Sequence, residues 1–229
     1  MEDSSAAFSF MELFRMGGIL MWPLLFFSIA TVAITVERAV FLVYHDLAIS
    51  SLAEKAAAAL AVDGGGSGGI SAAEAQAFLE SQSRRTIAAR VFLAMVKHSA
   101  LSERRLEKAV EIEAVRSISS IESGFNLLTS LASLAPLTGF LGTVTGMISA
   151  FRSIAEAAEV NAQIVAGGIY EALVTTVFGL IIAIVAMSAH SIFTSISDKF
   201  ASELEIACSG LIVRLCESRA TREAAGNEQ

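Results

Sequence analysis

The sequence predicts an all-α integral membrane protein with three transmembrane helices, from its composition, its long apolar stretches and its placement of positive charge. Of the 229 residues, 54% are hydrophobic, the mean hydropathy is +0.64 and only two residues are proline. Such a composition favours helices in contact with lipid and disfavours a soluble domain. We therefore expect the lipid bilayer to surround this chain, and we expect no nucleic-acid partner.

Three stretches are long and apolar enough to cross a bilayer, whose core takes about 20 helical residues at roughly 1.5 Å each. The first stretch ends abruptly at Glu37 and Arg38. Three crossings place the two termini on opposite sides of the membrane. In chain order, the predicted segments are an N-terminal segment 1–16, a first crossing 17–36, a long loop 37–123, a second crossing 124–151, a short loop 152–167, a third crossing 168–193, and a C-terminal helix and tail 194–229.

Lys and Arg residues are distributed very unevenly among these segments. Ten of the sixteen lie in the long loop and four in the C-terminal tail, whereas the N-terminal segment and the short loop hold one each. Cytoplasmic loops retain an excess of positive residues. The predicted topology therefore has long helical extensions in the cytoplasm, with the C-terminus on that side and the N-terminus outside.

The cytoplasmic segments have helical patterns of their own. The glycine-rich run 63–69 predicts a flexible turn, after which Ser71 and Glu74 have the spacing of a capping box. From Ser102, a predicted N-cap, apolar residues recur at helical spacing without a strong breaker, so we expect the second membrane helix to begin deep in the cytoplasm. The third helix should likewise extend beyond the membrane. The N-terminal segment fits either an interfacial helix or disorder.

The second and third crossings differ from the first in carrying faces of small and hydroxyl-bearing residues. At about 100° per residue, each face follows one line along its helix. Small faces let helices approach closely, so packing explains them, but so does the lining of a pore, and the faces alone leave both interpretations open. The face of the second crossing is Ala132, Pro136, Gly139, Thr143, Gly146 and Ala150, and that of the third is Ala172, Thr176, Gly179, Ala183, Ala186 and His190.

Four polar or reactive residues, one of them in these faces, need an interpretation of their own. An acid inside a membrane segment is costly unless it is paired, protonated or wetted, so Glu171 is a candidate functional residue. Since it lies near the outer end of its crossing, an interfacial acid is the other interpretation. His190 fits an interface residue better than a proton relay. Cys208 and Cys216 lack a C-x-x-C spacing and are interpreted as small apolar residues on one helix.

Three sequence blocks resemble the MotA/TolQ/ExbB proton-channel family, and within it the ExbB/TolQ branch. The first block is GGxxMWPLL at 17–25, the second is APxxGxxGTVxGM at 135–147, and the third is GGIxEALxTTxxGL at 167–180. Members of the MotA branch have four membrane helices, so three predicted crossings argue against that branch.

The resemblance implies a subunit of a bacterial inner-membrane motor that uses the proton gradient to energise envelope transport, with no enzyme activity and no cofactor. ExbB-like proteins assemble as homopentamers around an ExbD-like single-span partner that carries a membrane aspartate, and a TonB-like protein can join them. By motif, Thr143, Thr176 and Glu171 line the ion pathway. The small faces then line the pore, at Ala132, Pro136, Gly139, Gly146, Ala172, Gly179 and Ala183.

Other interpretations remain beside this one. A TolQ-type or gliding-type subunit would serve envelope maintenance or motility, and a scaffold would stabilise the partner without conducting ions. An intramembrane enzyme is disfavoured, because the sequence has no HExxH, no GxSxG and no pair of membrane aspartates. The residues leave the choice between protons and sodium ions open, and they predict no metal site.

Overall fold

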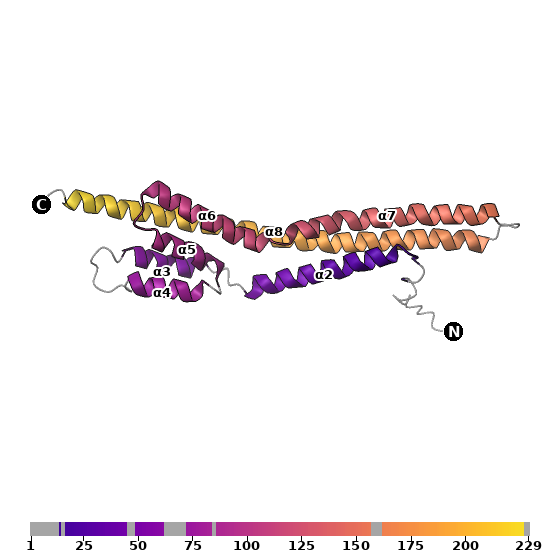
Figure 1. Ribbon diagram of the computed structural model, residues 1–229, viewed down its shortest axis with the longest axis horizontal. Helices are drawn as coiled ribbons and strands as arrows, with labels where there is room; N and C mark the ends of the chain where they lie inside the picture. Colours follow the sequence, from indigo (N-terminus) through magenta and orange to yellow (C-terminus); the bar gives the residue numbers. More distant parts are fainter. Residues whose placement is uncertain are drawn as a thin grey trace, which may run out of the picture. The chain divides into compact units, whose positions relative to one another are not determined.

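The computed structural model describes residue 14 and residues 17–44, 49–61, 72–83, 86–156 and 162–226. The elements defined in these residues are helices, which confirms the all-α class (Figure 1). The helices are α2 (Met21–Tyr44), α3 (Ser50–Ala61), α4 (Ala72–Gln82), α5 (Ile87–Lys97), α6 (Glu103–Glu122), α7 (Phe125–Glu156) and α8 (Ala162–Gly226).

Three parts of this chain are helical, long and apolar enough to cross a membrane: α2, a stretch within 103–156 and a stretch within 166–217. They correspond to the three predicted crossings. The helix α2 does not end where the first crossing is predicted to end, because it continues to Tyr44. Glu37 and Arg38 lie inside it and form an ion pair of 2.8 Å with each other.

The chain divides into two compact units that share α2 and α8. The first unit comprises residues 1–38 and 124–192, and the second comprises residues 39–123 and 193–229. The first unit holds the sequence blocks that resemble the proton-channel family.

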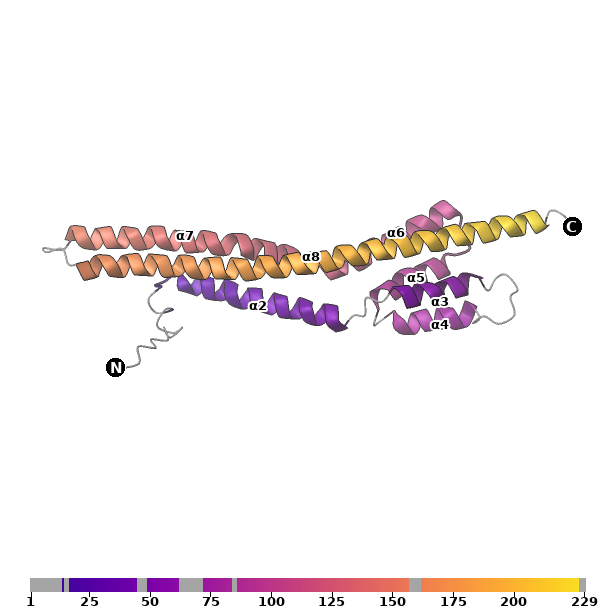
Figure 2. The same ribbon diagram turned by 180° about the vertical axis from the view of Figure 1, so that it is seen from behind.

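In the first unit, α7, the N-terminal half of α8 and most of α2 run side by side (Figures 1 and 2). A small core joins the three helices: Met21 and Leu24 of α2, Ala135 of α7 and Ile182 of α8 cluster together and are at most 6% exposed. Packing of three helices at one cluster fixes the face that α2 presents to α8.

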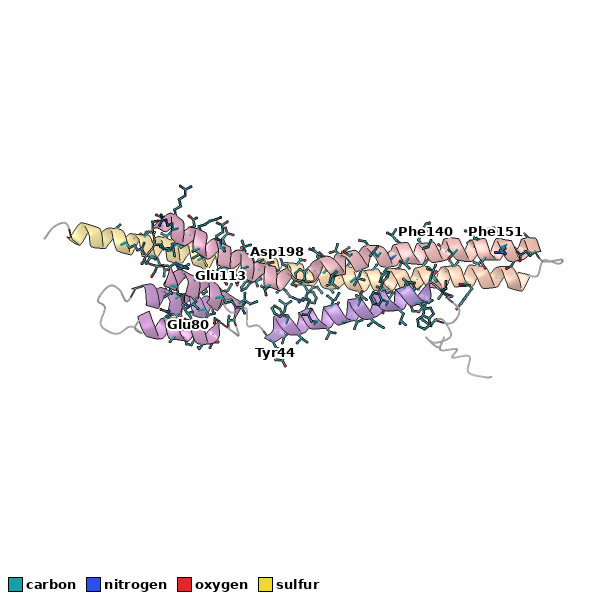
Figure 3. All side chains as sticks on the ribbon, viewed as in Figure 1. Tyr44, Glu80, Glu113, Phe140, Phe151 and Asp198 are labelled. Carbon is teal, nitrogen blue, oxygen red and sulfur yellow. The ribbon has the colours of Figure 1, made fainter. Side chains whose placement is uncertain are left out.

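Large apolar side chains cover the outer surface of the first unit. Phe140 and Phe151 on α7 are 64% and 63% exposed, and Figure 3 shows both on the side of α7 away from α8. Trp22 and Phe26 of α2 are exposed to a similar degree. Apolar surface on this scale suits lipid or neighbouring helices rather than water.

The prediction of one continuous helix from Ser102 into the second crossing was wrong at one point. The helix α6 ends at Glu122, and α7 begins at Phe125 after Ser123 and Gly124. Gly124 has φ +88°, a left-handed conformation that costs glycine little because it has no Cβ. One glycine in a helical pattern was too weak a sign to predict this break.

The second unit is a helical bundle. The helices α3, α4 and α5 pack against one another, and α5 also packs against α6. Leu79, Phe92 and Leu106 are fully buried in its core. At its C-terminal end, Arg219 of α8 donates a hydrogen bond of 2.8 Å to the carbonyl of Leu101. The helix α8 is 65 residues long, which confirms the predicted extension.

Two predicted helix starts have different outcomes. Ser102 is the N-cap residue of α6, but its hydroxyl makes no capping hydrogen bond. Instead, its carbonyl accepts hydrogen bonds of 2.9 Å from the N–H groups of Arg105 and Leu106. The capping box at Ser71, the glycine-rich run and the first thirteen residues lie outside the described residues.

The cysteines lie on the part of α8 that belongs to the second unit. Cys208 is buried, and burial raises its pKa to about 12, so the thiol stays protonated and unreactive at neutral pH. Cys216 is partly exposed and also free. Both agree with the interpretation as small residues on one helix.

Candidate ion pathway on the α7–α8 pair

The helices α7 and α8 meet at glycines, and they approach so closely that a side chain at these glycine positions would collide with the other helix. A Cβ on Gly139 would lie 2.8 Å from the carbonyl oxygen of Thr175, and a Cβ on Gly179 would lie 2.6 Å from that of Ala135. A Cβ on Gly146 would lie 3.0 Å from the Cβ of Ala172. Four residues of the predicted small faces therefore bring the two helices together within one chain.

Several residues at this contact were not in the predicted faces, among them Ala135 and Gly142 on α7 and Gly168 and Thr175 on α8. Thr175 is 1% exposed, and its side chain fills the space that a Cβ on Gly142 would need. Its hydroxyl donates to the carbonyl of Ala172 at 2.9 Å. The sequence held a signal for Gly142, which lies three residues after Gly139 and four before Gly146, a spacing that keeps all three near one face.

Thr143 and Thr176 lie on the same flank of the α7–α8 pair. Each directly follows a residue of the contact, Gly142 on α7 and Thr175 on α8, and so is turned by about 100° from it. Gly139 meets Gly179 whereas Gly146 meets Ala172, so the helices are antiparallel. In an antiparallel pair, these two rotations of about 100° place Thr143 and Thr176 on the same side of the pair.

The hydroxyls of these two threonines are bonded differently. Thr143 Oγ1 donates to the carbonyl of Phe140 on its own helix at 2.6 Å. Thr176 Oγ1 donates across the pair to the carbonyl of Gly139 at 3.1 Å. Since each oxygen also has lone pairs, each can accept a hydrogen bond from water or contact a cation.

The other predicted pore-lining residues lie at the edge of the same contact. Ala132 is 6% exposed, whereas Pro136 and Ala183 are half-buried. Pro136 lies inside α7, where its missing N–H leaves the carbonyl of Ala132 without the usual helical partner. This edge therefore has an acceptor in addition to the threonine hydroxyls.

Glu171 lies on another side of α8. It is five residues before Thr176, hence about 140° away around the helix. Its half-buried carboxylate points at Gly18, in the turn that precedes α2. The structure therefore brings Thr143 and Thr176 together and places Glu171 at the contact with α2.

His190 contacts α7 near the other end of the first unit. Its ring packs edge-on against that of Phe125, with centroids 6.1 Å apart, and its Nδ1 lies 3.4 Å from Thr129 Oγ1. These contacts join the two helices. In the described part of the chain, no three His, Cys, Asp or Glu side chains come together as metal ligands would.

Comparison with known proteins places these features in a family. The model of the MotA/TolQ/ExbB proton channel family matches residues 83–206. Over 207 residues, the chain is 31% identical to putative biopolymer transport protein ExbB-like 1 of Synechocystis, covering 84% of this chain and 76% of that protein.

Two shorter matches bear other names. Over 84 residues the chain is 38% identical to the Tol-Pal system protein TolQ of Haemophilus influenzae, covering 37% of each protein. Over 110 residues it is 31% identical to the biopolymer transport protein ExbB of Xanthomonas campestris, covering 48% of this chain and 42% of that one. The matched family is one of channel and transport proteins rather than a known enzyme class. With its three apolar helices, the chain is a multi-pass membrane protein that belongs to the MotA/TolQ/ExbB proton channel family.

Proposed function

We propose that this chain is the pore-forming subunit of a bacterial inner-membrane motor driven by the proton gradient. It conducts ions together with an ExbD-like single-span partner that carries a membrane aspartate, and it energises envelope transport, with a TonB-like protein as the recipient of the force. The family match and the ExbB names of its relatives support this function.

The observation that carries the proposal is the shared flank of Thr143 and Thr176. Two hydroxyls with free lone pairs lie on one side of this helix pair. An ion that crosses a bilayer needs such groups, because a charge in hydrocarbon is costly unless polar atoms or waters surround it. A partner's carboxyl group on this flank would complete the pathway.

The proposed assembly is a homopentamer in which this flank faces the central pore. Each α7–α8 pair would form one segment of the wall, held together by the glycine contact behind it. Ala132, Pro136 and Ala183 would border the threonines. This arrangement makes the small faces serve both packing and pore, at different positions along the same two helices.

The proposed orientation places the segments rich in Lys and Arg in the cytoplasm, and the N-terminus and the loop after α7 outside it. Ala155 is exposed near the outer end of α7 and Ser209 is exposed on the extension of α8. In a chain with Cys208→Ala and Cys216→Ala, Ala155→Cys should react with a membrane-impermeant maleimide in spheroplasts. Ser209→Cys should react only after the membrane is opened, and the reverse pattern would invert the proposed topology.

A TolQ-type role in envelope maintenance is the second candidate, and the 38% identity to TolQ supports it. It uses the same site and differs in the process that receives the force. Deleting the gene and testing separately for loss of gradient-driven uptake and for loss of outer-membrane integrity distinguishes the two roles.

Replacing the threonines by valine separates a channel from a scaffold. Thr143→Val and Thr176→Val keep the side-chain shape and remove the hydroxyls, so a channel should lose gradient-dependent activity in cells while the protein still accumulates in the membrane. Thr145→Val is the matched control, since Thr145 lies about 160° from Thr143 around α7 and bonds only within its own helix. A scaffold would work equally well with all three changes.

A further inference from the structure

We propose that Glu171 is a positioning residue, whose carboxylate holds the turn before α2 against α8. It thereby fixes the outer end of the first membrane helix, instead of contacting the ion. The contact itself is independent of the proposed function, which enters only through the activity measured in one of the tests below.

Glu171 belongs to the face of α8 that packs against α2. Phe178 and Ile182 follow it by seven and eleven residues, so the three side chains lie near one line on the helix. Ile182 clusters with Met21 and Leu24 of α2, and Phe178 packs against that cluster. The acid therefore continues an established helix contact toward the outer end of α2.

Gly18 makes room for the carboxylate in a way that other residues would not. A Cβ at this position would collide with Glu171 Oε1 and would lie 2.8 Å from its Cδ. Gly18 also has φ +65°, a conformation that side chains disfavour. The carboxylate thus occupies the place of the missing side chain, on a turn whose shape already favours glycine.

The N-terminus of α2 favours an acidic side chain at this contact for electrostatic reasons. The first N–H groups of a helix lack intrahelical partners and carry a partial positive charge, which a nearby carboxylate stabilises. The first turn of α2 contains no acidic residue of its own. At the start of α2, the N–H groups of Met21 and Trp22 are bonded to the carbonyls of Gly18 and Ile19. Glu171 adds a negative charge from α8 beside this turn, where it complements the positive end of the helix dipole.

Placement on this face separates Glu171 from the threonine flank. Thr176 points about 140° away around α8, and Thr143 shares the flank of Thr176. A single carboxylate cannot both contact Gly18 and line that flank. Its effect on conduction therefore passes through the position of α2.

A double-mutant cycle between the two residues tests the contact in the assembled complex. Gly18→Ala should displace the carboxylate, and Glu171→Ala should remove it, each lowering the thermal midpoint of the detergent-solubilised complex by roughly 2–8 °C. Together they should lower it by clearly less than the sum, because the alanine at 18 then has no carboxylate to displace.

Gly17→Ala is the matched control, because the atoms nearest to a Cβ there belong to the side chain of Met21 and not to Glu171. Its effect should add to that of Glu171→Ala without coupling. If the effects of Gly18→Ala and Glu171→Ala are also additive, the proposed contact does not hold the turn and the proposal is overturned, whatever the fate of the ion-pathway proposal.

The conservative variant Glu171→Gln tests whether the acid touches the ion. Glutamine keeps the shape and loses the charge. The thermal midpoint of the Glu171→Gln complex should therefore lie between those of the wild type and Glu171→Ala. Its remaining proton flux should keep the pH profile of the wild type. A shifted pH profile with unchanged thermal stability would assign Glu171 to the ion pathway instead.

If Gly18→Ala alone fails to assemble, recovery of assembly in Gly18→Ala/Glu171→Ala supports the proposal and continued failure contradicts it.

Discussion

Hydroxyl groups on α7 mostly find acceptors on their own helix. Ser133, Thr138 and Thr145 each donate to the carbonyl four residues earlier, at 2.9–3.0 Å. Such bonds satisfy the donor without water, so a hydroxyl in a membrane helix is by itself no sign of a pathway. What distinguishes Thr143 and Thr176 is their shared flank, which depends on how two helices face each other.

The bond from Thr176 to the carbonyl of Gly139 adds a refinement to the valine experiment. Thr176→Val removes this bond, worth about 1 kcal/mol, as well as the proposed ion contact. Thr176→Ser keeps the hydroxyl and should keep activity, measured as gradient-dependent uptake at equal protein level. Loss of activity in the serine variant would show that the methyl group, and hence packing, is what matters at this position.

Individual residues also show why the site could be predicted only in part. The motif blocks identified Thr143, Thr176 and Glu171 together, because a sequence block records that residues occur near each other in the chain. A sequence block does not record toward which side of the helix each side chain points. The contact of Glu171 with Gly18 joins positions more than 150 residues apart, and no local pattern in the sequence encodes it.

At the scale of elements, the glycine contact decides how closely α7 and α8 approach. A Cβ on Gly179 would meet the backbone oxygen of Ala135 at 2.6 Å, and backbone cannot move aside without shifting a helix. Without a hydrophobic drive between helices in lipid, such close packing is a main source of association. The threonine flank depends on it, since separating the helices would also break the bond from Thr176 to Gly139.

Gly179→Ala should therefore destabilise the first unit by about 1–3 kcal/mol through overpacking. The measurement is the thermal midpoint of the purified complex, which should fall. Gly210→Ala on the extension of α8 is the control, because no described atom lies within 4 Å of its Cβ position. That change should leave the midpoint unchanged or raise it, since alanine favours a helix. Equal effects of the two changes would rule out the glycine contact as a determinant of stability.

Which elements exist was largely predictable, whereas their junctions were not. Long apolar runs indicated three membrane helices, and helical spacing indicated the extension of α8, because both signals repeat over many residues. The break at Gly124 depends on one residue in a left-handed conformation, which leaves no periodic trace. The continuation of α2 past Glu37 and Arg38 was hidden because charge ends an apolar run without ending a helix.

For the whole molecule, function depends on copies and partners beyond a single chain. One α7–α8 pair offers hydroxyls on a flank and cannot enclose a pore. The proposed pentamer would repeat that flank around a central space, and the partner's helix would supply the ionisable group. The family membership of the chain supports this assembly, and the exposed apolar surfaces of α2 and α7 leave room for both lipid and neighbouring subunits.

Proton flux through the reconstituted complex tests directly whether Thr143 and Thr176 line an ion pathway. The chain and its single-span partner, purified together, are placed in liposomes under an imposed pH gradient, and flux is followed with an internal pH-sensitive dye. We expect partner-dependent flux that falls roughly tenfold or more in the Thr143→Val/Thr176→Val double variant, since each lost polar contact to an ion is worth about 1–3 kcal/mol. Thr145→Val should conduct like the wild type. Wild-type flux in the double variant would show that the ion does not pass along the threonine flank, and that this flank is a packing surface.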